Sequence, residues 1–343
     1  MPSFIQTFGR FSATLHGVIV SSILVTGMLV SLLGGVLADR YGRVALGSLV
    51  FGIGAAVETT SVKLAMFIIG RLIKGVGEGI FLMTVYVLVA EISPAKRHGT
   101  VTNITQIMIS SGIVLGYFIC YGTQVINGSL SWRLPLAIQA TVALTNTAAC
   151  SLVPQSPRWL LMKGLTEQTR QTIAQLGIAA EEQEELFRQA VAGLEHSPNL
   201  SIFDSVKDVF AAPVRGRTIF GSFILAMQQF SGIDGVLYYA PIIFRQAGLR
   251  STEASFFASG ISALVMMIIT VPATLMCDMW GRRTSSLVGG SLTFFFMLLI
   301  GSLYAAGKVY AHHGVARWVV IVSVYLWACV FSVQPGHWVF ACI

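Results

Sequence analysis

The chain has 343 residues, of which 55% are apolar and only 11% are charged, whereas an ordinary soluble domain has about 25% charged residues. Its 22 basic and 15 acidic residues are too few to cover the surface of a water-soluble protein of this length. We therefore expect most of the chain to lie in a lipid bilayer. The net charge of +7 comes from basic residues in short loops rather than from one basic patch, which argues against nucleic-acid binding.

The cysteines, histidines and glycines lack the arrangements that metal-binding and nucleotide-binding proteins need. The five cysteines all lie in apolar stretches without zinc spacing, and the six histidines form no metal-binding motif. The run 42–48 has the glycine spacing of a phosphate-binding loop but lacks its lysine. We expect no enzyme activity, no metal and no cofactor. The first apolar run is too long for a cleavable signal peptide, so we expect it to span the membrane.

Long apolar runs predict nine membrane-spanning helices. A bilayer core of about 30 Å needs about 20 apolar residues at about 1.5 Å each. Most connections are short, so neighbouring spans are expected to be antiparallel. The predicted spans are 16–37, 45–62, 64–89, 101–122, 132–152, 218–240, 254–276, 285–306 and 317–341.

The basic residues orient these spans. Most of the lysines and arginines lie in four connections, which we therefore place in the cytoplasm, with the N-terminus outside. These connections are 38–44, 91–99, 154–217 and 277–284.

A polar insert separates the first five spans from the last four. Its residues 166–170 and 181–194 are predicted to form short amphipathic helices that face water. The sequence thus predicts an all-α integral membrane protein with three parts: an N-terminal half at 1–153, an intracellular helical linker at 154–216 and a C-terminal half at 217–343.

An Asp-x-x-Gly-Arg motif occurs twice at matching places. It follows the first span as Asp39, Gly42 and Arg43, and the seventh as Asp278, Gly281 and Arg282. Glycine permits a tight turn there, while aspartate and arginine can pair across a cytoplasmic gate. Two matched copies favour a transporter built from two related halves.

Taken together, the motifs resemble the sugar porter family of the major facilitator superfamily, and most of all its fungal members, over essentially the whole chain. The residues that carry the resemblance are 35–43, 70–71 with Gly75, Gly77 and Gly79, 91–94, 154–160, 228–234 with Tyr238 and Tyr239, 278–283 and 335–338. The resemblance implies twelve helices in two six-helix bundles, an intracellular helical domain, alternating access and a sugar site at mid-membrane. By this resemblance the chain lacks the family's first helix and its last two.

The resemblance also implies the residues that contact the sugar. Amides and carboxylates suit this task because they form paired hydrogen bonds with neighbouring hydroxyls, and burying them without a ligand or water is costly. The implied substrate-binding residues are Gln106, Gln228, Gln229, Asp234, Tyr239 and Trp338.

The residues alone leave two questions open at this site. Asp234 and Tyr238 share one face of a straight helix, whereas Gln228 points elsewhere unless glycines such as Gly232 loosen the turn. The two glutamines have an alternative role in hydrogen bonds between helices. Trp338 has an alternative role as an anchor at the membrane interface.

A cytoplasmic gate is expected from the charged residues of the family motifs. These residues are Asp39, Arg43, Glu91, Arg97, Arg158, Asp278, Arg282 and Arg283.

Three charged residues lie on one stripe of the span 64–89. Arg71, Lys74 and Glu78 are spaced i, i+3 and i+7, and charges within a span usually pair or line water. We expect a structural Lys74–Glu78 pair, with a role in transport as the alternative. If transport is coupled to protons, Asp234 and Glu78 are the candidate carriers.

The GxxxG spacings Gly75/Gly79 and Gly112/Gly116 predict close helix packing.

Four residues depart from the family pattern. Asp234 and Met266 stand where the family usually has asparagine, Gln155 where it has glutamate, and His98 where it has arginine. The site thus gains an acid at Asp234 and loses an amide at Met266. These two changes predict a substrate other than a plain hexose. The loss of a charge at Gln155 predicts a weaker cytoplasmic gate.

The function expected from the sequence is transport of a sugar or polyol by alternating access at the plasma membrane, with proton coupling left open. Its partners are then the solute and the lipid bilayer. Two alternatives remain: a non-transporting remnant or sugar sensor, and an efflux carrier for a small metabolite.

Overall fold

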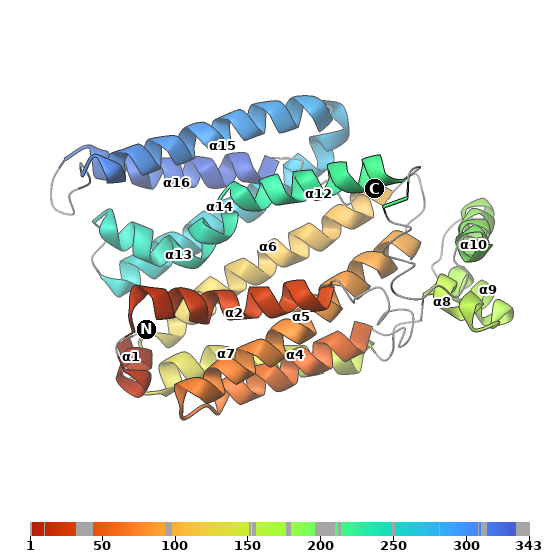
Figure 1. Cartoon of the computed structure of the whole chain (residues 1–343), viewed down its shortest axis with the longest axis horizontal. Coiled ribbons are helices and arrows are strands. Elements are labelled where there is room, and N and C mark those ends of the chain that lie inside the picture. The colour runs from red at the N-terminus through yellow and green to blue at the C-terminus, as the bar shows by residue number, and fades with distance from the viewer. Residues whose placement is uncertain are drawn as a thin grey trace. The chain divides into compact units, whose positions relative to one another are not determined.

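The computed structural model is helical almost throughout the residues that it describes. These residues are 2–9, 11–31, 44–92, 98–150, 152, 156–175, 180–195, 210–211, 214–248, 251–280, 282–307, 309 and 314–333. They form two compact units (Figure 1). The first unit comprises residues 1–98 and 126–208, and the second comprises 99–125 and 209–343.

The first unit holds four apolar helices at predicted spans and four other helices in the described residues. The apolar helices are α2 (Ala13–Ser31), α4 (Val44–Thr59), α5 (Leu64–Ile92) and α7 (Leu130–Cys150). The other helices are α1 (Pro2–Phe8), α8 (Pro157–Met162), α9 (Thr166–Gln175) and α10 (Ala180–Glu195). The second unit holds α6 (His98–Thr123), α12 (Arg215–Phe230), α13 (Ile233–Gln246), α14 (Thr252–Trp280), α15 (Arg282–Ala305) and α16 (Ala316–Val333).

The predicted spans all coincide with helices where the structure describes them. One prediction needs correction, because the span expected as a single helix at 218–240 consists of two helices, α12 and α13, and extends to Gln246. Both amphipathic helices expected in the polar insert are present as α9 and α10. Helix α8 was not predicted. It starts with Ser156, whose hydroxyl accepts a hydrogen bond from the Trp159 N–H at 3.2 Å.

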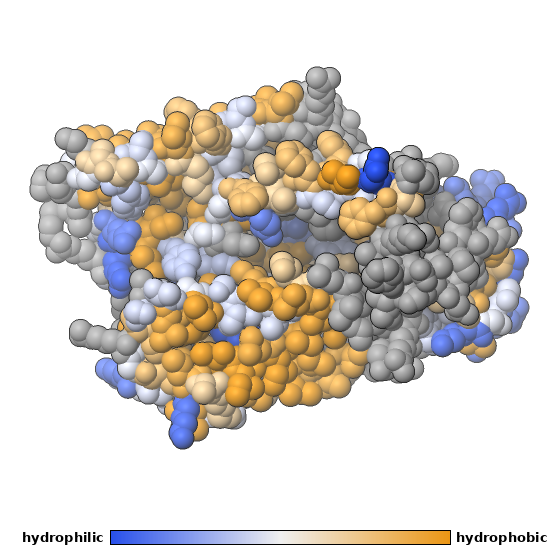
Figure 2. Space-filling view, viewed as in Figure 1, coloured by the Kyte–Doolittle hydropathy of each residue, from blue (hydrophilic) through white to orange (hydrophobic). Residues whose placement is uncertain are grey.

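The surface of the described helices is that of a membrane protein. Large apolar side chains are exposed, among them Leu115 (62%) and Phe294 (68%). Figure 2 shows hydrophobic side chains spread over the surface of α2 and α4, and hydrophilic ones on α9 and α10. Six described helices are long and apolar enough to cross a bilayer, and α4 is a shorter apolar helix. The chain is therefore a multi-pass membrane protein.

Glycines let α5 approach two neighbouring helices closely. A Cβ atom at Gly75 would lie 2.4 Å from the Ile23 carbonyl oxygen of α2, and one at Gly77 would lie 2.2 Å from the Phe51 backbone nitrogen of α4. Gly79 meets α2 in the same way, so the predicted Gly75/Gly79 packing is confirmed.

For Gly112 and Gly116, the described residues show no such close packing. No described atom lies within 4 Å of a Cβ at either position. The GxxxG spacing provides a smooth helix surface, but no described helix packs closely on that part of α6.

Candidate substrate site

Helices α12 and α13 meet at a break in the backbone. Ser231 and Gly232 separate them, and Gly232 has φ +84° and ψ +16°, the left-handed conformation that glycine adopts without strain. Among the described side chains none caps the start of α13, so its first N–H groups lack the acceptors of a continuous helix. The condition that the sequence left open, a loosened turn at Gly232, is met.

An apolar floor packs against this break. Ile233 of α13, Met266 of α14, and Trp327 and Phe331 of α16 are buried in one cluster. The rings of Trp327 and Phe331 are stacked, with centroids 5.4 Å apart. A Cβ atom at position 232 would lie 2.9 Å from the Met297 Cε atom of α15. The break is thus fixed from three neighbouring helices.

Two features of this floor concern ligand chemistry. Met266, which departs from the family's asparagine, is 6% exposed and packs in the apolar cluster. The indole nitrogen of Trp327 is buried and has no hydrogen-bond partner among the described residues. The sequence analysis did not select Trp327, because a tryptophan in an apolar span resembles any other core aromatic residue.

The predicted substrate-binding residues are only partly described. Gln229 is exposed at the end of α12, directly before the break, and Tyr239 is half-buried on α13. Gln106 is half-buried on α6, which belongs to the same unit. Gln228 and Asp234 lie on α12 and α13 respectively, but their side chains are outside the described set, as is the whole of Trp338.

Three side chains of α6 contact α13 and α14. The Ser111 hydroxyl donates to the Met267 sulfur at 3.4 Å, and the ring centroids of Tyr121 and Phe257 are 5.6 Å apart. Between these contacts, the Tyr117 hydroxyl donates a hydrogen bond to a backbone carbonyl of α13. The helix that carries Gln106 therefore contacts α13 and α14 through these side chains.

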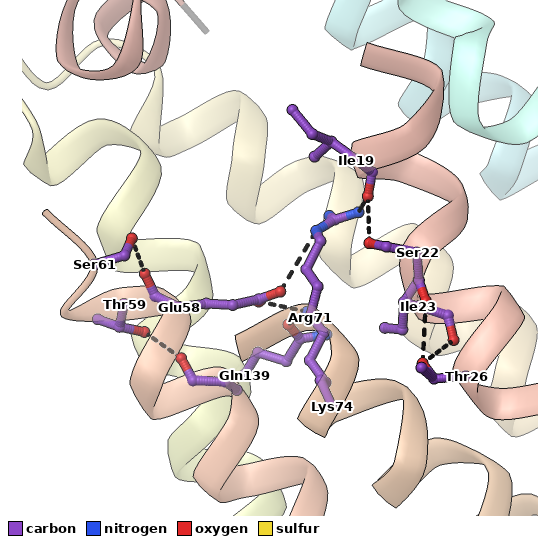
Figure 3. Close-up of polar contacts among 11 residues, drawn as sticks. Ile19, Ser22, Ile23, Thr26, Glu58, Thr59, Ser61, Arg71, Lys74 and Gln139 are labelled. Atoms are coloured by element: carbon purple, nitrogen blue, oxygen red, sulfur yellow. Dashed lines mark hydrogen bonds and ion pairs between the residues drawn. The ribbon is translucent and has the colours of Figure 1, made fainter. Parts of the chain in front are cut away.

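A separate buried polar cluster lies within the first unit (Figure 3). The Glu58 carboxylate of α4 is 0% exposed. Its Oε2 atom accepts a hydrogen bond from Lys74 Nζ at 2.6 Å, and Lys74 also donates to Gln139 Oε1 of α7 at 3.2 Å. Its Oε1 atom lies 3.4 Å from Arg71 Nε.

Arg71 extends this cluster to a further helix. Its Nη1 atom donates to the Ile19 carbonyl of α2 at 2.7 Å, and its guanidinium lies 5.4 Å from the centre of the Phe67 ring. The cluster therefore joins all four apolar helices of the first unit. It can hold these helices together, and it places two cations beside one carboxylate.

This arrangement corrects the sequence-based pairing. Lys74 forms its ion pair with Glu58, not with Glu78 as expected. Spacing along one helix favours a partner one turn away, whereas the close approach of α4 to α5 brings Glu58 nearer. Glu78 is half-buried on α5 and interacts electrostatically with Lys74. Glu58 was overlooked, although it is the only acid in the span 45–62.

The cytoplasmic gate cannot be assembled from the described side chains. Glu91, Arg158, Asp278, Arg282 and Arg283 have described backbones at helix ends, but their side chains lie outside the described set. Asp39, Arg43 and Arg97 lie outside the described residues altogether. The gate stays a prediction.

Comparison with known sequences finds transporters. Residues 5–343 match the family model described as "Sugar (and other) transporter". "Probable polyol transporter 4" of Arabidopsis thaliana is 31% identical over 301 residues, which cover 85% of this chain and 57% of the relative. The glucose transporter GlcP of Staphylococcus epidermidis is 32% identical over 337 residues, covering 97% of this chain and 72% of the relative.

Comparison with solved structures identifies the fold. The xylose transporter XylE from E. coli matches with a TM-score of 0.80 at 22% identity, over 99% of this chain and 77% of that chain. A second structure of XylE, described as a major facilitator superfamily proton:xylose symporter, also matches with a TM-score of 0.80. The fold is therefore that of the major facilitator superfamily, as the sequence predicted.

Proposed function

Because this chain belongs to the sugar transporter family, we propose that it moves a sugar or polyol across a membrane by alternating access. The observation that carries the proposal is the broken helix α12–α13. An amide side chain, Gln229, is exposed at the break, and the buried rings of Trp327 and Phe331 of α16 pack against the break from inside. Amides form paired hydrogen bonds with hydroxyls, so the exposed amide suits a polyhydroxy solute.

We assign the predicted polar residues to this site. Gln229 and Tyr239 lie on the two sides of the break, and Gln106 lies on α6, whose Tyr117 donates a hydrogen bond to α13. Gln228, Asp234 and Trp338 belong to the same proposal on the basis of the sequence resemblance. Met266 is buried in the apolar cluster, so the site lacks the amide that the resemblance implies at this position.

The proposal also includes coupling of transport to protons and a location in the plasma membrane. XylE, which shares the fold, is described as a proton:xylose symporter. The candidate proton carriers in this chain are Asp234 and Glu78. The buried Glu58 joins them as a third acid within the spans. The chain covers 57% of the plant relative.

Flux measurements on the purified chain in liposomes test the proposal. Radiolabelled D-glucose, D-xylose and xylitol are supplied outside, with and without an inward proton gradient. We expect saturable uptake of at least one solute, and accumulation with the gradient if transport is coupled. Uptake no faster than in empty liposomes, with the protein correctly inserted, would contradict the proposal. Binding without flux would favour a sensor, and flux only outward would favour an efflux carrier.

A further inference from the structure

Helix α13 contains a proline where a regular helix needs an N–H donor. Pro241 has no N–H, so the Leu237 carbonyl, four residues earlier, loses the hydrogen bond that it would receive in an unbroken helix. Within a bilayer no bulk water replaces this donor. The Tyr117 hydroxyl of α6 donates to that same Leu237 carbonyl. Tyr117 therefore supplies the hydrogen bond that Pro241 removes.

The segment held by this bond carries part of the proposed site. It runs from the break at Gly232 to Pro241, about two helical turns, and bears Asp234 and Tyr239. Its backbone is irregular at both ends: Gly232 is left-handed, and Pro241 interrupts the hydrogen-bond ladder. Contacts from neighbouring helices therefore set its direction: Ile233 and Ala240 are buried against α14 and α16, and the Tyr117 bond adds a polar contact from α6.

Tyr117 lies on a helix whose side chains also contact α14. Ser111, six residues before it, contacts Met267, and Tyr121, four residues after it, contacts Phe257. Tyr117 follows Gln106 by eleven residues, which is about three turns, so both lie on nearly the same face of α6. The bond to Leu237 therefore fixes the α13 segment relative to the helix that presents Gln106.

We propose that Tyr117 is a positioning residue of the solute site. By donating a hydrogen bond to the carbonyl that Pro241 leaves free, it sets the orientation of the segment 233–240. This inference rests on the proposed function, since the segment binds a solute only if the break is a transport site. Tyr117 itself does not need to touch the solute. Its removal is expected to misplace Asp234 and Tyr239 and to weaken binding.

The first test is equilibrium binding of radiolabelled D-glucose, D-xylose and xylitol to the purified chain. Tyr117→Phe keeps the ring and removes the hydroxyl. We expect it to raise the dissociation constant of the bound solute several-fold, up to about tenfold. Tyr325→Phe is the matched control. The Tyr325 hydroxyl donates to the Ala258 carbonyl at 2.9 Å, but Ser262, four residues further on, retains its N–H, so we expect unchanged binding.

The second test is rescue. Pro241→Ala supplies an N–H to the Leu237 carbonyl, so we expect Tyr117→Phe/Pro241→Ala to bind more tightly than Tyr117→Phe alone. Melting temperatures are measured for every variant, because a purely structural role would lower them without this rescue of binding. Wild-type binding by Tyr117→Phe, or no rescue by Pro241→Ala, would overturn the inference alone. No solute binding by the unaltered chain would overturn the proposed function and this inference with it.

Discussion

The Glu58 carboxylate lies 2.6 Å from the Lys74 ammonium, and both side chains are buried between α4 and α5. Arg71 shares the same carboxylate at 3.4 Å. Breaking a buried pair by removing one partner is costly because the remaining charge stays out of water. The cluster thus makes the packing of the first unit depend strongly on a single acid.

Glu58→Gln is expected to destabilise the protein more than Lys74→Gln. Removing the carboxylate leaves two cations without their shared partner and costs about 3–5 kcal/mol of unfolding free energy. Removing Lys74 leaves Glu58 beside Arg71 and costs less. Denaturation in detergent micelles, followed by circular dichroism, measures the difference. The double variant should lose less than the sum of the two single losses, and strict additivity would argue against the pair.

Gly77→Ala is expected to separate α4 from α5. A Cβ atom there would lie 2.2 Å from the Phe51 backbone nitrogen, and backbone cannot move aside as a side chain can. Overpacking of this kind costs about 1–3 kcal/mol. Gly116→Ala is the control, since no described atom lies within 4 Å of its Cβ position. Melting temperatures should fall for Gly77→Ala and stay level or rise for Gly116→Ala. Equal shifts would contradict this account of the packing.

Met266→Asn is expected to lower the stability of the protein and to increase its stabilisation by a bound solute. The amide would enter a cluster formed by Ile233, Trp327 and Phe331, and an unsatisfied buried polar group costs about 1–3 kcal/mol. A bound solute can satisfy that amide, so its stabilising effect on the melting temperature should exceed that in the unaltered protein. Met266→Leu, which conserves volume and polarity, should change neither value much. A solute effect no larger in Met266→Asn would place position 266 away from the site.

The membrane spans were predictable because bilayer thickness and backbone hydrogen bonding leave few choices for an apolar run. The span expected at 64–89 begins at the same residue as α5. The sequence predicted the break at Gly232 only as a possibility on which the direction of Gln228 depended. Glycine permits a left-handed turn without requiring one.

The contacts between helices could not be predicted from the sequence. The Lys74 pair was assigned to Glu78 from spacing along one helix, whereas its partner comes from α4. Gly112 and Gly116 have the spacing for close packing, but no described helix uses it. Pro241 signals a carbonyl without its helical donor, yet only the fold identifies Tyr117 as the replacement. The domain boundaries at 153 and 216, the gate and the likeness to fungal members stay predictions.

The central claim is that the break between α12 and α13 binds the solute, and Gln229→Ala tests it most directly. Gln229 is exposed at the break, so its loss should not affect folding. Gln246→Ala is the matched control, because Gln246 is exposed at the far end of α13. The measurement is the dissociation constant of the radiolabelled solute that the purified chain binds. We predict a several-fold increase, up to about tenfold, for Gln229→Ala and no change for Gln246→Ala. Equal affinities for Gln229→Ala and the unaltered protein would contradict the claim.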